Sequence, residues 1–153
     1  LPVANRKVLV VCFGNTCRSP MLEGLLKRDL AIAGKEIVVE SAGTLQKSDQ
    51  GANPHSITCM RERDIDITTH RSRWVGNLDL ANYERIYVMG GNLKDELVKM
   101  GALADKIEIL REANGGVPNP FNANLSADQQ DMAKYIPCAK VLEEESRRIV
   151  PAL

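Results

Sequence analysis

Residues 7–26 combine a thiol, a guanidinium and a hydroxyl at a spacing suited to chemistry on phosphate. Cys12 lies six positions before Arg18, and Ser19 follows directly. A thiolate is a strong nucleophile, and a guanidinium can bind two phosphate oxygens at once through its planar fork. This spacing therefore predicts that Cys12 attacks a phosphoryl group while Arg18 holds its oxygens.

The elements on either side of this segment are a strand and a helix. Residues 8–11 are all apolar, as in a buried strand, and leucines recur at helical spacing over residues 22–30. A tight loop from a strand into a helix N-terminus directs backbone N–H groups and the positive end of the helix dipole toward an anion. The expected phosphate-binding residues are Phe13, Gly14, Asn15, Thr16, Cys17, Arg18 and Ser19.

Length and composition restrict the class of protein. The chain has 153 residues, of which 44% are hydrophobic and 26% charged, so we expect a single domain over residues 1–153. Lys plus Arg and Asp plus Glu number 20 each, which gives no sign of attraction to nucleic acid or membranes. We expect no membrane span and no targeting segment. Four cysteines without a C-x-x-C pair predict no metal site, and a cytoplasmic location is expected.

Strand and helix patterns alternate along the chain. The expected strands cover residues 7–12, 37–41, 85–89 and 107–110. The expected helices cover about 19–33, 54–63, 93–100 and a C-terminal region that Ser126 begins as an N-cap and that Pro137 breaks or kinks near Ile136. This alternation predicts an α/β fold with a parallel sheet and right-handed crossovers. The loops after Cys12, after Ser41 and from Asn114 would then face one crevice at the carboxyl ends of the strands.

Four motifs resemble one family. The run V-C-F-G-N-T-C-R-S-P at residues 11–20 resembles the phosphate-binding loop of the low-molecular-weight protein tyrosine phosphatases. The later motifs are S-A-G-T at 41–44, D-I-x-x-H-R-S-R at 66–73 and N-P-F at 119–121. The resemblance implies a three-layer α/β sandwich with helices on both faces of a four-stranded parallel sheet of order 2-1-3-4. It also implies hydrolysis of phosphotyrosine in protein substrates, with phosphate or another oxyanion in the loop and no cofactor.

The resemblance extends to the roles of single residues. Cys12 would form a cysteinyl-phosphate that water hydrolyses, while Arg18 stabilises the equatorial oxygens during transfer. Ser19 would donate a hydrogen bond to the thiolate, and its alternative role is that of an ordinary helix N-cap. The residues expected to form a network that supports the loop are Asn15, Ser19, Ser41 and His70.

The cysteines fall into two groups. The resemblance suggests a reversible Cys12–Cys17 disulfide that blocks the nucleophile and protects it from further oxidation. We expect Cys59 and Cys138 to be structural.

Asn119 departs from the family pattern. Family members have an Asp there, which protonates the leaving oxygen and later activates water, whereas an amide can do neither. General acid–base catalysis contributes about 10²- to 10⁴-fold, so we expect reduced activity, retained on activated aryl phosphates. Three explanations are open. Asn119 is an engineered change, or it is natural and restricts the enzyme to leaving groups that need little protonation, or a carboxylate elsewhere in the chain takes the role of the missing Asp. Asp128 and Asp131 are the nearest in sequence, but both fall in the predicted helical region, which disfavours the last reading.

Thr16 bears on substrate choice. Tyrosine-selective relatives commonly have a bulkier aliphatic residue there, whereas a protein-arginine phosphatase branch resembles this chain in C-x-G-N-T-C-R-S-P-M and in the pair 54–55. Phe13 and Phe121 are expected at the entrance, where they could stack on an aromatic ring or a guanidinium. Phosphotyrosine is the first expectation and phosphoarginine the second.

Two further functions remain as alternatives. Arsenate reductases share a similar loop and fold, but they need additional, closely spaced cysteines. In this chain Cys59 and Cys138 are far apart in sequence, which disfavours arsenate reduction. An intact loop without the acid could instead bind phosphoproteins without turning them over.

Overall fold

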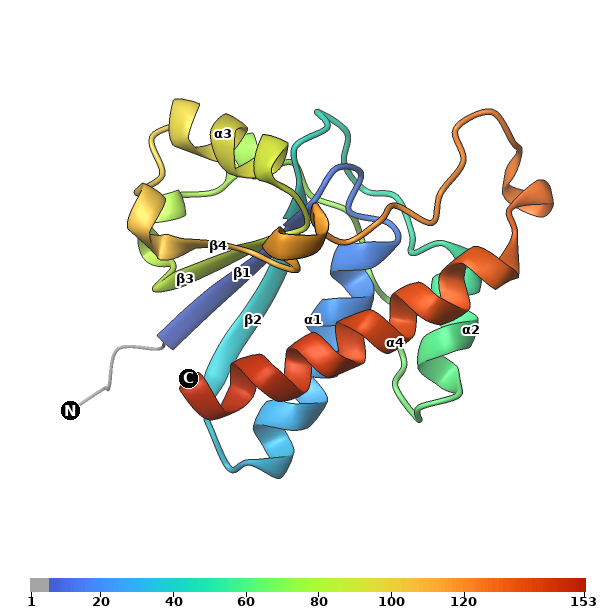
Figure 1. The fold of residues 1–153 in the computed structure, drawn as a ribbon, viewed down its shortest axis with the longest axis horizontal. Coiled ribbons are helices and arrows are strands. Elements are labelled where there is room, and N and C mark those ends of the chain that lie inside the picture. The colour runs from blue at the N-terminus through green and yellow to red at the C-terminus, as the bar shows by residue number, and fades with distance from the viewer. Residues whose placement is uncertain (1–5) are drawn as a thin grey trace.

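A four-stranded parallel sheet forms the centre of the structure, a computed structural model that describes residues 6–153 (Figure 1). Its strands are β1 (Arg6–Cys12), β2 (Ile37–Gly43), β3 (Arg85–Val88) and β4 (Ile107–Ile109). Their order is β2-β1-β3-β4, which confirms the expected order 2-1-3-4.

The central position of β1 explains its uninterrupted apolar run. Residues 8–11 are fully buried, as expected for a strand that is covered on both faces of a parallel sheet. Val11 pairs in register with Ala42 on β2 and with Val88 on β3. The carboxyl ends of these three strands are therefore level, and the loops that follow them open at one edge.

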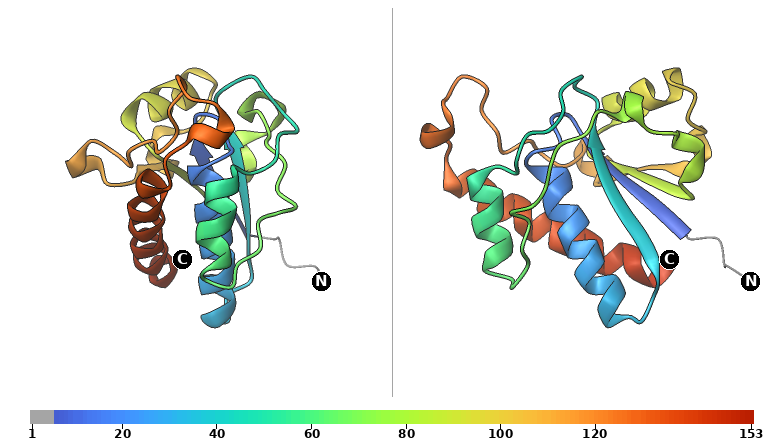
Figure 2. Two further views of the ribbon diagram at one scale, coloured as in Figure 1. Left: turned by 90° about the vertical axis from the view of Figure 1, so that its right-hand side faces the viewer. Right: turned by 180° about the vertical axis from the view of Figure 1, so that it is seen from behind.

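Helices cover both faces of the sheet, as predicted. They are α1 (Arg18–Ile32), α2 (Pro54–Arg61), α3 (Gly91–Lys99) and α4 (Met132–Ile149). The chain moves from β1 to β2 in one direction and from β3 to β4 in the other, so right-handed crossovers place α1 and α3 on opposite faces. Helices α1, α2 and α4 pack against one another as one layer (Figure 2).

The ends of α1 and α2 follow local rules. Gly34 adopts a φ of 70°, and the N–H groups of Gly34 and Lys35 donate to carbonyl groups of the last turn of α1. Asn53 precedes α2, and its side chain accepts a hydrogen bond from the His55 N–H at 2.9 Å.

The start of α4 differs from the prediction. Ser126 caps a short 3₁₀ helix (Ala127–Gln129), and α4 begins only at Met132. The α4 N-cap is Asp131, whose carboxylate accepts from the Ala133 N–H at 2.9 Å. Two capping residues thus lie five positions apart, and the chain turns between the short helix and the long one.

The predicted break at Pro137 was wrong, because α4 continues through it, while the alternative of a kink near Ile136 stays a prediction. Proline removes one backbone donor, but Pro137 is only the sixth residue of the helix, so most of the hydrogen-bond ladder lies beyond it. Tyr135, Ala139 and Leu142 are each fully buried on the inner side of the helix. Their packing outweighs the lost bond.

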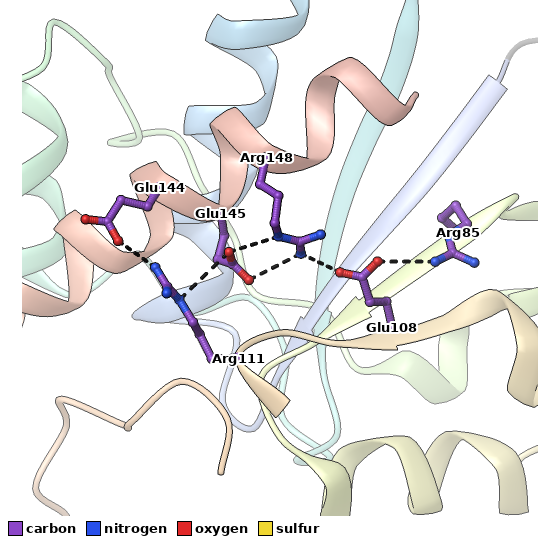
Figure 3. Close-up of polar contacts among 6 residues, drawn as sticks. All are labelled: Arg85, Glu108, Arg111, Glu144, Glu145 and Arg148. Atoms are coloured by element: carbon purple, nitrogen blue, oxygen red, sulfur yellow. Dashed lines mark hydrogen bonds and ion pairs between the residues drawn. The ribbon is translucent and has the colours of Figure 1, made fainter. Parts of the chain in front are cut away.

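Charged side chains connect the sheet to α4 (Figure 3). The six residues drawn are Arg85, Glu108, Arg111, Glu144, Glu145 and Arg148. Arg148 contacts both Glu108 and Glu145, and Arg111 lies 2.6 Å from Glu144 and 3.8 Å from Glu145. This network anchors the chain just after β4, where the loop toward Asn119 begins. No helix within residues 6–153 has the length and apolar character needed to cross a membrane.

Candidate active site

A cavity of about 450 Å³ opens at the carboxyl ends of the strands. Three segments line it: the loop between β1 and α1, the connection from β2 to α2, and the loop around residues 119–123. All three loops that the sequence placed at one crevice, those after Cys12, after Ser41 and from Asn114, thus line this cavity.

Cys12 lies at the floor of this cavity. It ends β1 and is only 3% exposed, yet its side chain is part of the cavity lining. Its Sγ lies 3.0 Å from the Ser19 Oγ and accepts a hydrogen bond from the Asn15 N–H at 3.2 Å. Two hydrogen-bond donors therefore converge on this sulfur beside the N-terminus of α1.

Asn15 sets the direction of the hydrogen bonds around the sulfur. Its Oδ1 accepts from the Arg73 N–H at 2.9 Å, so its Nδ2 must donate to the Ser19 Oγ at 2.7 Å and the Ser41 Oγ at 3.0 Å. Because the Ser19 oxygen already accepts from this amide, its own hydrogen is free to point at the Cys12 sulfur. A backbone N–H of the 66–73 segment thus orients a hydroxyl donor toward the Cys12 sulfur.

His70 completes the predicted network. Its Nε2 lies 2.7 Å from the carbonyl oxygen of Asn15, which can only accept, so this nitrogen carries the hydrogen. Asn15 has a φ of 56°, a left-handed conformation that asparagine adopts at low cost. Burial lowers the pKa of His70, against the opposing effect of this hydrogen bond. The structure therefore brings together all four expected residues: Asn15, Ser19, Ser41 and His70.

Ser19 is not the N-cap of α1, so that alternative was wrong. Cys17 occupies the cap position without a side-chain hydrogen bond, and Ser19 lies within the first turn, fully buried. Its hydroxyl faces Cys12 instead.

Gly43 explains the S-A-G-T motif. A Cβ at this position would lie 2.5 Å from the carbonyl oxygen of Phe13, so only glycine allows β2 to approach the loop. The next two N–H groups, of Thr44 and Leu45, donate to the carbonyls of Cys12 and Phe13 at 3.2 and 2.9 Å. The end of β2 thereby holds the backbone of the loop between β1 and α1.

Arg18 lines the cavity and is 8% exposed. Its Nη1 donates to the carbonyl oxygen of Val117 at 2.8 Å. A guanidinium has five N–H donors, so the others remain able to bind a phosphate.

Asn119 also lines the cavity, but no carboxylate does so within residues 6–153. The Asn119 Oδ1 accepts from the Phe121 N–H at 3.2 Å. Asp131 caps α4, and Asp128 lies in the exposed 3₁₀ helix. The expectation that neither replaces the missing acid agrees with these positions.

The expected specificity residues lie around the cavity. Thr16, Phe13 and Phe121 all line it, and the two aromatic side chains are 50% and 40% exposed. The entrance is thus largely apolar and can pack against a flat group.

Cys17 points toward α4. Its Sγ lies 3.5 Å from the Tyr135 Oη, and burial raises its pKa. Burial likewise raises the pKa of Cys59, and it raises that of Cys138 to about 12. All four cysteines are buried free thiols, so the Cys12–Cys17 disulfide stays a prediction.

Sequence reasoning missed several residues at the site. Tyr135 is fully buried and also packs on His55, with the ring centroids 5.1 Å apart. The Asn53 N–H donates to the Thr16 carbonyl at 2.8 Å, and Lys47 lines the cavity. The Asn-Pro pair at the start of α2 could have indicated that Asn53 lies at a helix N-terminus beside the site. Nothing in the sequence indicated that Lys47, an exposed lysine in a polar loop, lines the cavity.

The comparisons with known proteins agree with this geometry. The model of the family "Low molecular weight phosphotyrosine protein phosphatase" matches residues 7–153. A probable low molecular weight protein-tyrosine-phosphatase EpsP of Ralstonia solanacearum is 36% identical over 92 residues, which are 60% of this chain and 61% of that relative. The chain therefore matches about three fifths of that relative's length.

Two other matches cover more. A protein-arginine-phosphatase of Bacillus subtilis is 29% identical over 128 residues, 80% of this chain and 85% of that relative. The crystal structure of a low molecular weight protein tyrosine phosphatase from T. tengcongensis superposes with a TM-score of 0.86 at 28% identity, over 97% of this chain and 100% of that one. Relatives named arsenate reductase also match. The chain belongs to the low molecular weight phosphotyrosine protein phosphatase family.

Proposed function

We propose that this protein hydrolyses phosphotyrosine in proteins through a cysteinyl-phosphate on Cys12. The observation that carries the proposal is the Cys12 sulfur at the cavity floor, 3.0 Å from the Ser19 hydroxyl. The Cys12 thiolate attacks phosphorus in line, and the tyrosine oxygen leaves with the electron pair of the broken bond. Arg18 stabilises the equatorial oxygens during this transfer. Water then attacks phosphorus, and the Ser19 hydrogen bond stabilises the departing thiolate.

Asn119 restricts the first step. It has no proton to give to the leaving oxygen, so groups that leave readily as anions are the favoured substrates. The proposed enzyme is therefore slow on phosphotyrosine and faster on activated aryl phosphates. A free thiolate nucleophile functions in a reducing compartment, so we place this activity in the cytoplasm.

Hydrolysis of p-nitrophenyl phosphate and of a phosphotyrosine peptide tests the proposal. Cys12→Ser should abolish turnover of both, whereas Cys59→Ser, a buried thiol that does not line the cavity, should retain it. Tight binding of the phosphopeptide without any turnover would instead support a phosphoprotein-binding module.

Thr16 supports phosphoarginine as a second candidate substrate. Its side chain lines the cavity, and the Bacillus subtilis relative is named a protein-arginine-phosphatase. A hydroxyl at this wall makes the slot more polar than an aliphatic residue would. Relative rates on phosphoarginine and phosphotyrosine peptides, before and after Thr16→Ile, separate the two. If Thr16→Ile leaves the rate on the phosphoarginine peptide unchanged, phosphoarginine is no longer a candidate substrate.

A further inference from the structure

One side of the cavity mouth is cationic. Arg18 and Lys47 are the charged residues that line the cavity within the described part of the chain. Arg18 is committed to the phosphate, whereas Lys47 is exposed at the rim. A second cation lies nearby, because the Nη1 of Arg71 is 3.7 Å from the position of a Cβ built on Gly51, another lining residue.

Backbone hydrogen bonds hold these two cations on one rim. The Asp49 N–H donates to the Ser72 carbonyl, and the Ser72 N–H donates to the Gln50 carbonyl, each at 2.8 Å. The Ser72 side chain also accepts from the Gln50 N–H at 2.9 Å. The segment with Lys47 and the segment with Arg71 therefore run side by side.

No carboxylate within residues 6–153 forms an ion pair with either cation. Arg73, two residues further along, lies 3.7 Å from the Glu40 carboxylate, but no such ion pair forms at Lys47 or Arg71 within residues 6–153. Asp49 is the one acidic residue between positions 44 and 53, and it does not line the cavity. The rim thus presents two exposed cations whose charges are available to a ligand.

We propose that Lys47 and Arg71 select substrates that have an acidic side chain next to the phosphorylated residue. With the phosphate on Arg18 and the ring against Phe13 and Phe121, the flanking residues of a bound peptide leave the cavity over its rim. A carboxylate there would meet two cations, whereas a lysine would be repelled. This inference rests on the proposed function, since it names the kind of phosphoprotein that the site accepts.

Two phosphotyrosine peptides that differ only in having Glu or Gln on both sides of the phosphotyrosine test it. Exposed ion pairs are individually weak, so two of them should make kcat/KM about twofold to thirtyfold higher for the Glu peptide, mainly through KM. The preference should shrink at high salt. Lys47→Gln/Arg71→Gln should bring the ratio close to one, while the charge-matched control Lys99→Gln/Lys140→Gln, with both residues exposed and outside the cavity lining, should keep it.

Binding of the same peptides to Cys12→Ser separates this inference from the proposed function. If Cys12→Ser prefers the Glu peptide while the native protein turns over neither, the proposed hydrolysis fails and the rim selectivity stands. Equal affinity and equal kcat/KM for the two peptides, or a preference that survives Lys47→Gln/Arg71→Gln, would overturn the rim selectivity.

Discussion

The Arg18 guanidinium donates through Nη1 to the Val117 carbonyl oxygen at 2.8 Å, and this bond joins residues that are 99 positions apart. Val117 is itself held to the end of β3, because its N–H donates to the Met89 carbonyl at 2.8 Å. Arg18 and the loop that holds the expected acid position therefore share one anchor. Asn119 lies two residues beyond it, at the cavity wall.

This anchor makes Asn119→Asp an informative change. A carboxyl group at a wall position that already faces the cavity should protonate the leaving oxygen, and turnover of aryl phosphates with poor leaving groups should rise at least tenfold. Steady-state kinetics across a series of leaving groups measures this. Asn124→Asp, which adds the same charge to the same loop outside the cavity lining, is the control. An unchanged rate for Asn119→Asp would mean that the acid position is misassigned.

Asn15 should be sensitive to replacement in two separable ways. Asn15→Ala loses the hydrogen bonds to Ser19 and Ser41. It also places alanine, whose side chain cannot form a local hydrogen bond, in the left-handed conformation at a φ of 56°. We expect the free energy of unfolding to fall by about 2–4 kcal/mol and kcat to fall at least tenfold, since the Ser19 hydroxyl loses its orientation. Denaturant unfolding and kinetics test both effects.

Asn15→Gly is the matched control, because glycine tolerates the left-handed conformation. It should recover about 1 kcal/mol of the loss in stability without recovering kcat. Native-like kcat in Asn15→Gly would show that the side-chain network does not support the nucleophile.

His70 should make the protein less stable on acidification. Its pKa in the folded protein lies below the ordinary value of 6.5, because burial disfavours the imidazolium. Between the two values the unfolded chain binds more protons, so the free energy of unfolding decreases as the pH falls from 7 through 6.5 toward the folded pKa. His70→Asn should show a shallower decrease over this interval in urea unfolding, and NMR titration of the native protein should place the His70 midpoint below that of a model peptide. A raised midpoint would contradict the expected sign.

Glu145 and Glu144 offer a paired test of the network in Figure 3. The Glu145 side chain is 6% exposed and contacts Arg148 and Arg111, while the Glu144 side chain is 50% exposed. Glu145→Gln should lower the free energy of unfolding by about 2–3 kcal/mol, less than for a fully buried pair because Arg148 is half exposed. Glu144→Gln should cost less than about 1 kcal/mol. Equal losses in chemical denaturation would show that burial does not strengthen this network.

Mild peroxide should convert Cys12 and Cys17 to a disulfide. Peroxide oxidises the Cys12 thiolate to a sulfenic acid, and the Cys17 sulfur then displaces its oxygen as water. Peptide mapping by mass spectrometry should find the linked pair, and a thiol reductant should restore activity. Sulfinic acid at Cys12 as the main product would argue against the disulfide.

The sequence by itself predicted the parallel α/β sheet and the loops that meet at its carboxyl edge, while the strand order and the residues around Cys12 came from the resemblance of short motifs to one family. Each of these depends on a local pattern: an apolar run, a tight turn with Asn15, or a motif of a few residues at the end of a strand. Right-handed crossovers then leave few ways to arrange such elements, so the loops had to meet at one edge of the sheet. The same local rules failed at Pro137, where burial of Tyr135 and its neighbours keeps α4 intact.

Only the tertiary structure decided which distant groups meet at the site. The bond from Arg18 to Val117, the contact of Cys17 with Tyr135 over 118 positions and the shared rim of Lys47 and Arg71 have no signal in local spacing. They arise because packing of α4 and of the loops against the sheet edge brings separate segments within hydrogen-bond distance. Contacts of this kind depend on the shape of the whole molecule, whereas helices, strands and anion-binding turns are determined by a few neighbouring residues.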